Sequence, residues 1–432
     1  MRMNSSEKSL DTDIENLTNF FDSFNLLTGI FRGNFYYDEP KQYYFTTKIH
    51  NKSPYLQDKK HHKKQTIYAG GNSFSSKKLA LLKCLGEAVE RLCQETFSLK
   101  NISFDTYEHL QKTQQNLSIN GDTPLSNEVK IGWTSCTRLI DGSPSLIPAQ
   151  FAHYSFVSFY DEPVITSLIS TGGATGTSHE KTLLAGLYEV IERDAFTTTY
   201  FIKAPVVHID IGSIENEEVQ AINQSLKKYY LEWHLFDISN DIRVPVYLSL
   251  LLDRTGIGPA VTSGASSSHD PIESIMKSVS EATMSRPWIR ASLSDDRGYH
   301  SIMRAETKGI QKRLERGLYW FYTERIQKLS FWLDLPKVKM KRKGVVFRSP
   351  SEELSTVVSR LEKLGFPIYY VNLTHDQLRP FHFKVYKVIV PKLHGLYLDN
   401  TTMKYDIHRL DQVASYFNVS ADKLNKIPHP FL

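Results

Sequence analysis

The chain has little cysteine, no long apolar run and almost no net charge, and each absence excludes a class of protein. Its 432 residues include 3 cysteines, 52 Lys+Arg and 47 Asp+Glu, which gives a formal net charge of +5. Cys84, Cys93 and Cys136 are too few for a disulfide framework and contain no Cys-x-x-Cys pair that would indicate structural zinc. A nearly balanced charge lacks the dense cations that phosphate-backbone binding needs. We therefore expect no nucleic-acid partner and a reducing, cytoplasmic location.

Signals for export, membrane insertion and nucleotide loops are also missing. Residues 1–18 are polar and alternate in charge, so they lack the apolar segment of a secretory signal. The apolar stretch from Val246 to Leu252 is far shorter than the ~20 residues of a membrane-spanning helix. No Gly-x-x-x-x-Gly-Lys-Ser/Thr motif occurs, which excludes a P-loop as the means of holding ATP. These absences predict a soluble protein with no membrane span.

The composition is that of a globular protein, with 41% hydrophobic and 23% charged residues. We expect an N-terminal segment over residues 1–65 and one main domain over residues 66–432. The segment contains a basic loop over residues 51–65 and an amphipathic helix capped near Asp11 or Asp13. The helix should pack on the main domain through residues at helical spacing, which are Ile14, Leu17, Phe20, Phe21 and Phe24.

One sequence pattern occurs three times in the main domain: a Gly- or Ser-rich turn is followed by a helix that carries glutamate among apolar residues. The turns are expected at residues 70–73, 171–176 and 263–265. Strands are predicted where residues alternate or are β-branched, at 164–170, 206–211, 245–251, 344–347, 367–372 and 385–390. A basic helical region is expected over 302–335 and another helix over 352–364. Because helices and strands are mixed, the fold class is α+β.

The first of these helices, over residues 77–94, is apolar around most of its circumference and should be largely buried. Its polar residues, Lys83, Glu87, Glu90 and Gln94, lie on one stripe. The second and third helices repeat the pattern with further glutamates, which are Glu189, Glu192 and Glu281. Buried carboxylates one turn apart repel unless a cation or a proton offsets them.

Two interpretations of these glutamates remain open from the residues alone. If the helices converge, five carboxylates share one space and suit Mg²⁺ that bridges to substrate phosphates. Alternatively, the glutamates form ordinary helix-surface pairs, Glu87 with Lys83 and Glu281 with Lys277.

At these residues the sequence resembles the YcaO family of ATP-dependent enzymes that modify peptide backbones, and in particular its cyclodehydratase (D-protein) members. The resemblance spans roughly Tyr68 to the C-terminus. It rests on three ordered motifs, on Val385–Pro391 and on the Pro428–Pro430 tail. The motifs are Gly71–Asn72 with Leu85–Arg91, Thr171–Gly172 through Glu189–Asp194, and His269–Pro271 through Ser280–Arg286. The resemblance implies mixed helices and sheets around a glutamate-rich nucleotide site.

The resemblance also implies roles for individual residues. The metal ligands would be Glu87, Glu90, Glu189, Glu192 and Glu281. These five would also bind ATP, together with Lys83, Thr177, Glu180, Lys181, Arg193 and Lys277. The tail would reach toward the active centre, where Pro430 and the Leu432 carboxylate would take part in catalysis.

The activity implied is a cyclodehydratase that uses ATP and Mg²⁺. It converts Cys, Ser or Thr of a ribosomally made precursor peptide to thiazoline or oxazoline rings, as in bacteriocin biosynthesis, by phosphorylating the backbone amide oxygen. The chain shows no leader-binding module. A separate partner protein that recognises the leader is therefore expected, and a homodimer is a further expectation.

Several residues depart from the family pattern. Lysine stands at Lys83, Lys181 and Lys277, where the family usually has Ser, Glu and Arg, and Met284 replaces a usual Gln. Ser73 stands where Lys is common, and Leu432 replaces a closing Pro. The lysines could contact phosphate directly or neutralise the glutamates. A non-catalytic scaffold that docks a partner or peptide therefore stays open, as does a YcaO enzyme that forms a thioamide or amidine.

Three other residues have structural interpretations. Cys84 and Cys93 lie on a buried apolar face and are expected in the core rather than as nucleophiles. Asp194 is expected to order the end of its helix or to pair with Arg193.

Overall fold

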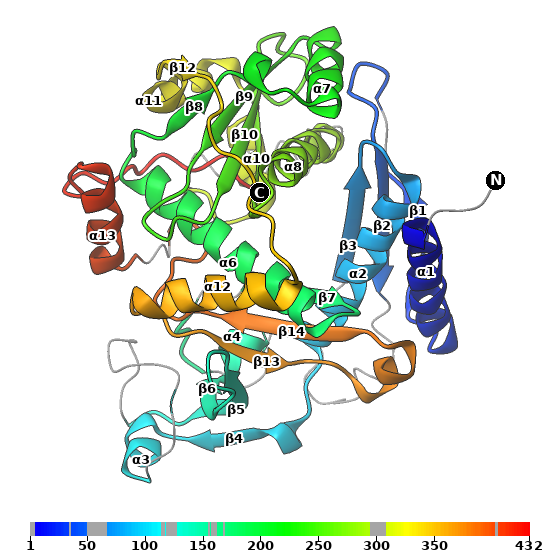
Figure 1. Cartoon of the computed structure of the whole chain (residues 1–432), viewed down its shortest axis with the longest axis vertical. Helices are drawn as coiled ribbons and strands as arrows, with labels where there is room; N and C mark the ends of the chain where they lie inside the picture. The colour runs from blue at the N-terminus through cyan, green and yellow to red at the C-terminus, as the bar shows by residue number, and fades with distance from the viewer. Residues whose placement is uncertain are drawn as a thin grey trace. The chain divides into compact units, whose positions relative to one another are not determined.

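The computed structural model shows two compact units, each assembled from separate stretches of the chain (Figure 1). It describes residues 5–33, 36–49, 67–113, 117, 128–153, 156, 162–166, 169–293, 308–401 and 405–432. The first unit comprises Met1–Gly33, Gln42–Val190 and Phe347–Lys392. The second comprises Asn34–Lys41, Ile191–Val346 and Leu393–Leu432. The boundary expected at residues 65 and 66 and the basic loop before it lie outside the described residues and stay predictions.

In the first unit, a three-stranded antiparallel sheet carries two helices. Its order is β1 (Leu27–Arg32), β2 (Tyr43–Ile49), β3 (Ile67–Ser73). Helix α2 (Lys77–Glu95) packs on β3, and α1 (Ser5–Ser23) packs on α2. Leu17 and Phe20 of α1 share a buried cluster with Leu85 and Val89 of α2, so the amphipathic N-terminal helix packs as predicted.

The predicted cap of this first helix is wrong. Helix α1 begins at Ser5, so Asp11 and Asp13 lie inside it. Asp11 instead forms an ion pair with Lys78 of α2, at 2.7 Å.

A six-stranded sheet completes the first unit. Its order is β4 (Ile102–Asp105), β5 (Ile131–Arg138), β13 (Tyr369–Asn372), β14 (Lys384–Ile389), β7 (Gly173–Gly176), and β6 (Pro144–Pro148) pairs with β5. The accompanying helices are η2 (Leu99–Asn101), α3 (Tyr107–Lys112), α4 (Ala149–Ala152), α12 (Pro350–Lys363) and η5 (Asp376–Phe381). Helix α2 also contacts β7 and β14 of this sheet, which explains why it is apolar around most of its circumference.

The second unit is built on a five-stranded sheet. Its order is β11 (Val261–Ser267), β10 (Val246–Asp253), β9 (Leu231–Asp237), β8 (Val207–Ile209), β12 (Lys337–Val338). Every residue of β10 is buried, and α8 (Pro271–Leu293) packs on β11 and β10. The other elements are η3 (Ile211–Ser213), α7 (Glu217–Lys228), α10 (Arg313–Tyr319), η4 (Thr323–Leu329), α11 (Ser330–Leu333) and α13 (Ile407–Phe417). Helix α6 (His179–Phe201) begins in the first unit and continues into the second.

The α+β class is confirmed. The segment at 171–176 begins, as predicted, with a turn at Thr171 and Gly172, where φ of Gly172 is +85°, and continues as β7. The Gly- or Ser-rich segments at 70–73 and 263–265 are instead strands, in β3 and β11. Their small residues are needed because a helix packs against the strand at close range. A Cβ at Gly71 would lie 2.9 Å from the Cα of Cys84, and a Cβ at Gly264 would lie 2.6 Å from the backbone nitrogen of Ala282.

Other predicted strands have mixed outcomes. The segments at 206–211, 245–251, 367–372 and 385–390 contain β8, β10, β13 and β14. The prediction at 164–170 is wrong for its described residues, which are irregular, and so is the prediction at 344–347. Val346 in the latter is 96% exposed, so its apolar character reflects no buried strand. The helical region expected over 302–335 consists, in its described part, of α10, η4 and α11.

Within the described part of the chain, none of the helices is both long and apolar enough to cross a membrane.

A buried ion network holds α6 and α13 together in the second unit. The carboxylate of Asp194 accepts from Arg409 Nη2 at 2.6 Å, from Asn240 Nδ2 at 2.9 Å and from the His394 backbone amide at 2.9 Å. Arg409 also bonds Asp241, at 2.7 Å. Burial alone would raise the pKa of Asp194, but the charge and hydrogen bonds of Arg409 hold it below its usual value. Asp194 is therefore structural, as expected, with Arg409 as its ion-pair partner instead of the predicted Arg193.

We expect Arg409→Met to lower the free energy of unfolding by about 3–5 kcal/mol, because it leaves a buried carboxylate without its cation. Urea unfolding followed by tryptophan fluorescence measures the change. Arg379→Met is the matched control, since Arg379 forms an exposed pair with Asp376 and should change the free energy by about 0.5 kcal/mol or less. Equal effects of the two variants would contradict the assignment.

Candidate nucleotide site

Three glutamates lie together in the first unit, and we call Glu87, Glu90 and Glu189 the carboxylate cluster. Backbone amides of glycine position two of them. Gly70 N–H donates to Glu87 Oε2 at 2.7 Å, and Gly172 N–H donates to Glu189 Oε2 at 3.1 Å. Hence the first two glycine-rich segments, at β3 and before β7, bind the glutamates of the helices that follow them.

Side chains of α2 supply further partners of Glu87 and Glu90. Arg91 Nε donates to Glu87 Oε1 at 2.8 Å, one turn along the helix. Gln94 Nε2 donates to Glu90 Oε1 at 3.0 Å. Glu87 thus has a cationic partner, whereas the hydrogen bond to Glu90 comes from a neutral amide.

The electrostatics of the cluster centre on Glu90 and on Lys387 of β14. Burial, followed by the charges of Glu189 and Glu87, raises the pKa of Glu90 to about 8. Burial lowers the pKa of Lys387 to about 8, against the opposing charges of Glu189 and Glu90. Lys387 Nζ donates to the Ile169 carbonyl at 2.9 Å and lies 4% exposed. At neutral pH, Glu90 therefore carries a proton, and the amino group of Lys387 is buried beside the cluster.

Glycine also forms the wall beside Glu90. A Cβ at Gly173 would collide with the Gln94 amide and lie 2.6 Å from Glu90 Oε1. The backbone therefore approaches the carboxylate directly, and any larger residue at this position would displace Glu90 or Gln94.

Glu192 and Arg193 belong to the second unit, one helical turn beyond Glu189 on α6. Glu192 is buried, and its Oε1 lies 3.4 Å from Arg193 Nε. The Arg193 guanidinium stacks over the Phe431 ring at 4.3 Å. The C-terminal tail therefore contacts α6 directly.

The tail is fixed by hydrogen bonds within the second unit. Trp320 Nε1 and the Tyr200 hydroxyl donate to the Pro428 carbonyl at 3.0 and 3.2 Å. His429 Nε2 lies 2.7 Å from the Tyr397 carbonyl oxygen. Pro430 is buried and Leu432 is half-buried. The extended tail predicted from its prolines thus packs against its own unit.

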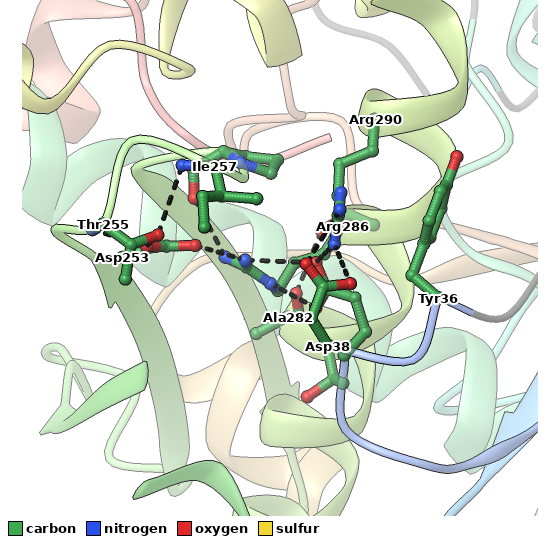
Figure 2. Close-up of polar contacts among 12 residues, drawn as sticks. Tyr36, Asp38, Asp253, Thr255, Ile257, Ala282, Arg286 and Arg290 are labelled. Atoms are coloured by element: carbon green, nitrogen blue, oxygen red, sulfur yellow. Dashed lines mark hydrogen bonds and ion pairs between the residues drawn. The ribbon is translucent and has the colours of Figure 1, made fainter. Parts of the chain in front are cut away.

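Glu281 lies on α8, whose position is set by an ion network around Arg286 (Figure 2). Arg286 Nε donates to Glu39 at 2.7 Å, and its Nη2 donates to Asp253 at 2.7 Å. Arg290, one turn further, pairs with Asp38 at 2.9 Å. All of these contacts are within the second unit, where Arg286 anchors the helix that presents Glu281.

The other residues expected at the site occupy more peripheral positions. Thr177 and Lys181 are exposed near the start of α6, and Glu180 accepts from the Ser178 hydroxyl at 3.1 Å. Lys181 precedes Glu189 by eight residues, roughly 12 Å along a helix.

The lysines of α2 and α8 do not make the pairs that helix spacing predicts. Lys83 Nζ donates to the Asn72 carbonyl at 3.3 Å, while Glu87 pairs with Arg91. Lys277 is exposed and pairs with Glu273 at 2.6 Å. These contacts replace the predicted Glu87–Lys83 and Glu281–Lys277 pairs.

Sequence reasoning missed Lys387 as a member of the site. The signal was present, because Lys387 is the only charged residue within the apolar run Val385–Val390. A lysine in a buried strand needs a carboxylate or several acceptors nearby. The ion pair of Arg286 with Glu39 could not be predicted in this way, because the two residues lie far apart in the sequence.

The described residues contain no group of three His, Cys, Asp or Glu side chains that could hold a metal ion by themselves. Mg²⁺ is usually bound by one or two carboxylates together with substrate phosphates. That Glu87, Glu90 and Glu189 hold Mg²⁺ together with a nucleotide stays a prediction. Convergence of all five predicted glutamates stays a prediction.

The cysteines of α2 are core residues, as expected. Burial raises the pKa values of the Cys84 and Cys93 thiols to about 12. Both thiols are uncharged at neutral pH and are poor nucleophiles.

We expect Glu90→Gln to change how stability depends on pH. Because folding raises the pKa of Glu90 from its ordinary 4.5 to about 8, its contribution to stability is full below pH 4.5 and is lost as pH rises toward 8. Glutamine does not titrate, so the variant should gain stability relative to the native protein over this range. Urea midpoints across the range, measured with a chelator, test this.

The exposed Glu108→Gln is the matched control for Glu90→Gln. Glu108 bonds Lys112 on the surface, and the pKa of Glu108 lies below its ordinary value. Its substitution should therefore give a constant offset above pH 5. A constant offset for Glu90→Gln as well would contradict the raised pKa.

Known proteins resemble the chain at low sequence identity. An uncharacterized protein of Methanothermobacter thermautotrophicus is 25% identical over 342 residues, 77% of this chain and 83% of that protein. An uncharacterized protein in the tfuA 3′ region of Rhizobium leguminosarum bv. trifolii is 25% identical over 176 residues, and the match covers 41% of its length.

Solved structures share the fold. A heterocyclase in complex with substrate and cofactor matches with a TM-score of 0.72 and 15% identity, over 96% of this chain and 57% of that one. YcaO from Methanopyrus kandleri, bound with AMPPCP and Mg²⁺, matches with a TM-score of 0.64 and 14% identity, over 90% of both chains. The E. coli microcin synthetase McbBCD complex matches with a TM-score of 0.52 and 14% identity, over 85% of this chain.

A family model described as YcaO cyclodehydratase, ATP- and Mg²⁺-binding, matches residues 73–394. This range includes all three glutamate-bearing helices. ATP and Mg²⁺ are thus the cofactors of the family, and the match extends over most of the chain. The protein belongs to the YcaO family of ATP-dependent enzymes.

Proposed function

We propose that the protein is the ATP-dependent cyclodehydratase component of a system that modifies a ribosomally made precursor peptide. Its products are thiazoline and oxazoline rings formed from Cys, Ser or Thr. The observation that carries this proposal is the family match over residues 73–394, which contain all five glutamates. The raised pKa of Glu90 on α2 supports it, because perturbed acidic groups are typical of functional sites.

In the proposed reaction, the peptide loses the elements of one water, and ATP is converted to ADP and phosphate. The side-chain thiol or hydroxyl loses its proton as its sulfur or oxygen attacks the preceding carbonyl carbon, and the carbonyl oxygen becomes an oxyanion. That oxyanion takes the γ-phosphoryl group and ADP leaves. Phosphate then departs with the former amide oxygen, the amide proton is lost, and a C=N bond forms. Phosphorylation is needed because the amide oxygen is otherwise a poor leaving group.

The residues of the chain would act mainly by binding and charge placement. Mg²⁺ supplies neutralisation of phosphate charge when bound. The residues proposed to hold it with the nucleotide are Glu87, Glu90, Glu189, Glu192 and Glu281. Ligation requires an ionised carboxylate, so Glu90 must release its proton when the metal binds. The further nucleotide contacts proposed are Lys83, Thr177, Glu180, Lys181, Arg193 and Lys277.

The tail is proposed to complete the active centre through Pro430 and Leu432. The contact between the Phe431 ring and Arg193, the residue that follows Glu192, supports this proposal. This contact keeps the end of the tail beside a proposed nucleotide ligand.

We also propose a separate partner that recognises the leader of the precursor peptide. The chain spans 57% of the length of the heterocyclase it matches, and the matched E. coli structure is a complex named McbBCD. A cytoplasmic location and a homodimer stay predictions.

A non-catalytic scaffold that docks a partner or peptide is the second candidate. Lys387 favours it, because this buried cation already offsets charge in the carboxylate cluster. A YcaO enzyme that forms a thioamide or amidine would use the same site, since the nucleotide ligands do not determine the nucleophile.

Mass spectrometry of a candidate precursor peptide tests the reaction. After incubation with ATP, Mg²⁺ and the partner, we expect the peptide to lose one water per modified residue, with matching phosphate release. Replacement of a backbone oxygen by sulfur or nitrogen would indicate a thioamide or amidine. An unchanged peptide without phosphate release would overturn the enzyme proposal.

Nucleotide binding by Glu192→Ala separates the enzyme from the scaffold without any peptide. We expect the variant to bind a Mg²⁺–ATP analogue at least about tenfold more weakly, because a charged ligand contact is lost. Calorimetric titration measures this. Glu217→Ala, on the exposed face of α7, is the control and should bind like the native protein. Absence of binding by the native protein would favour the scaffold.

A further inference from the structure

A strongly basic stretch of the second unit takes no part in the proposed nucleotide site. We call Lys337–Val346 the basic segment. It contains five cations and no acidic residue, in the sequence Lys-Val-Lys-Met-Lys-Arg-Lys-Gly-Val-Val. Its concentrated charge contrasts with a net charge of only +5 for the whole chain. Such a run needs an explanation beyond average composition.

The cations of the segment are arranged in a pattern that suits an extended chain. Lysines occur at every second position from Lys337 to Lys343, and all four are exposed. The alternate residues Met340 and Arg342 are half-buried. Lys337 belongs to the strand β12, and the other three lysines follow it in the chain. We call these four exposed lysines the lysine row.

The segment is held at the edge of the five-stranded sheet by contacts of the alternate residues. Val338 lies in β12, which pairs with β8. The backbone amide of Met340 donates to the Ser213 hydroxyl at 3.0 Å, and Arg342 Nη1 donates to Ser239 Oγ at 2.9 Å. Arg342 also lies 3.4 Å from the Asp237 carboxylate. These contacts tether the inner side of the segment and leave the lysine row toward solvent.

An open cavity of about 330 Å³ adjoins the end of the lysine row, where Lys343 and Arg342 contribute to its lining. Its apolar lining includes Pro271, Ile272, Met340, Val345 and Val346. Val346 is 96% exposed and Val345 is 54% exposed, so apolar surface is presented next to the cations. The one carboxylate in the lining, that of Asp270, accepts from the Ile272 and Glu273 backbone amides at the start of α8.

We propose that the basic segment and this cavity bind an acidic peptide in an extended conformation. Carboxylates at every second position of the peptide face Lys339, Lys341 and Lys343, and one apolar side chain enters the cavity. Addition of an extended peptide at the edge of a sheet is a common recognition mode. The positive charge of the basic segment favours an acidic partner. The apolar lining of the cavity favours a peptide, which can supply an apolar side chain, over a nucleic acid. Single-stranded nucleic acids stack on aromatic side chains, and none of the described residues that line the cavity is aromatic.

Fluorescence anisotropy with a labelled peptide tests the proposal. The probe has about ten residues, the span of the segment in extended form, with glutamate at alternate positions and one central leucine. We expect saturable binding that weakens as salt is raised. The assay contains no ATP, so its failure would leave the proposed reaction untouched, and failure of that reaction would leave the peptide site untouched.

Charge-reversed variants identify the surface. Lys341→Glu with Lys343→Glu should weaken binding at least about tenfold, because each change removes an attraction and adds a repulsion. Lys227→Glu with Lys228→Glu makes the same charge change on exposed residues of α7 and should leave binding unchanged. Equal weakening by the two pairs would overturn the site, and so would absence of binding by the native protein.

A second comparison tests the cavity. Val346→Ser and replacement of the probe leucine by serine should each weaken binding several-fold, and the two changes combined should weaken it little further. Val346 is almost fully exposed, so its substitution should not impair folding. Equally tight binding of an oligo-thymidylate with the same number of charges would overturn the proposal in favour of a general polyanion surface.

Discussion

Close contact between glycine-bearing strands and the helices that follow them is the constraint on which the rest of the structure depends. Gly71 meets α2, Gly264 meets α8, and Gly186 of α6 faces the Gly172 carbonyl, each at a distance that a side chain would not permit. The amides of Gly70 and Gly172 then reach Glu87 and Glu189. The glycine-rich segments that allow the packing of α2 and α6 therefore also supply the amides that position Glu87 and Glu189.

Amide donors position carboxylates but do not cancel their charge. In the cluster, Glu87 has Arg91 as its partner, whereas burial raises the pKa of Glu90 to about 8, so that Glu90 is protonated at neutral pH. The networks that only hold the fold differ, because Asp194 has a full cationic partner in Arg409. A buried acid with a strongly raised pKa and no cationic hydrogen-bond partner is typical of functional sites. This contrast distinguishes the site from the structural ion pairs.

Much of this organisation could be predicted from the sequence. Helical periodicity located α1, α2 and α12, and the apolar face of α2 correctly indicated its burial, together with that of Cys84. The glycine segments at 70–73 and 263–265 were mistaken for turns because composition alone does not separate a flexible turn from a strand that a helix must approach closely. The long-range partners of Asp194 and Arg286 could not be predicted, since pairing across 215 and 247 residues depends on the tertiary fold. The predicted ligand set follows from family motifs, and its convergence depends on that same fold.

The N-terminal segment contributes to both units rather than to one. Strands β1 and β2 belong to the first unit, while the residues between them, which include Asp38 and Glu39, belong to the second. There Glu39 bonds Arg286, which is 2% exposed and also bonds Asp253. A guanidinium buried so deeply needs more than one acceptor, because a single carboxylate leaves part of its donor fork unsatisfied. Since α8 carries Glu281, the segment before β2 takes part in positioning a glutamate that lies more than two hundred residues away in the sequence.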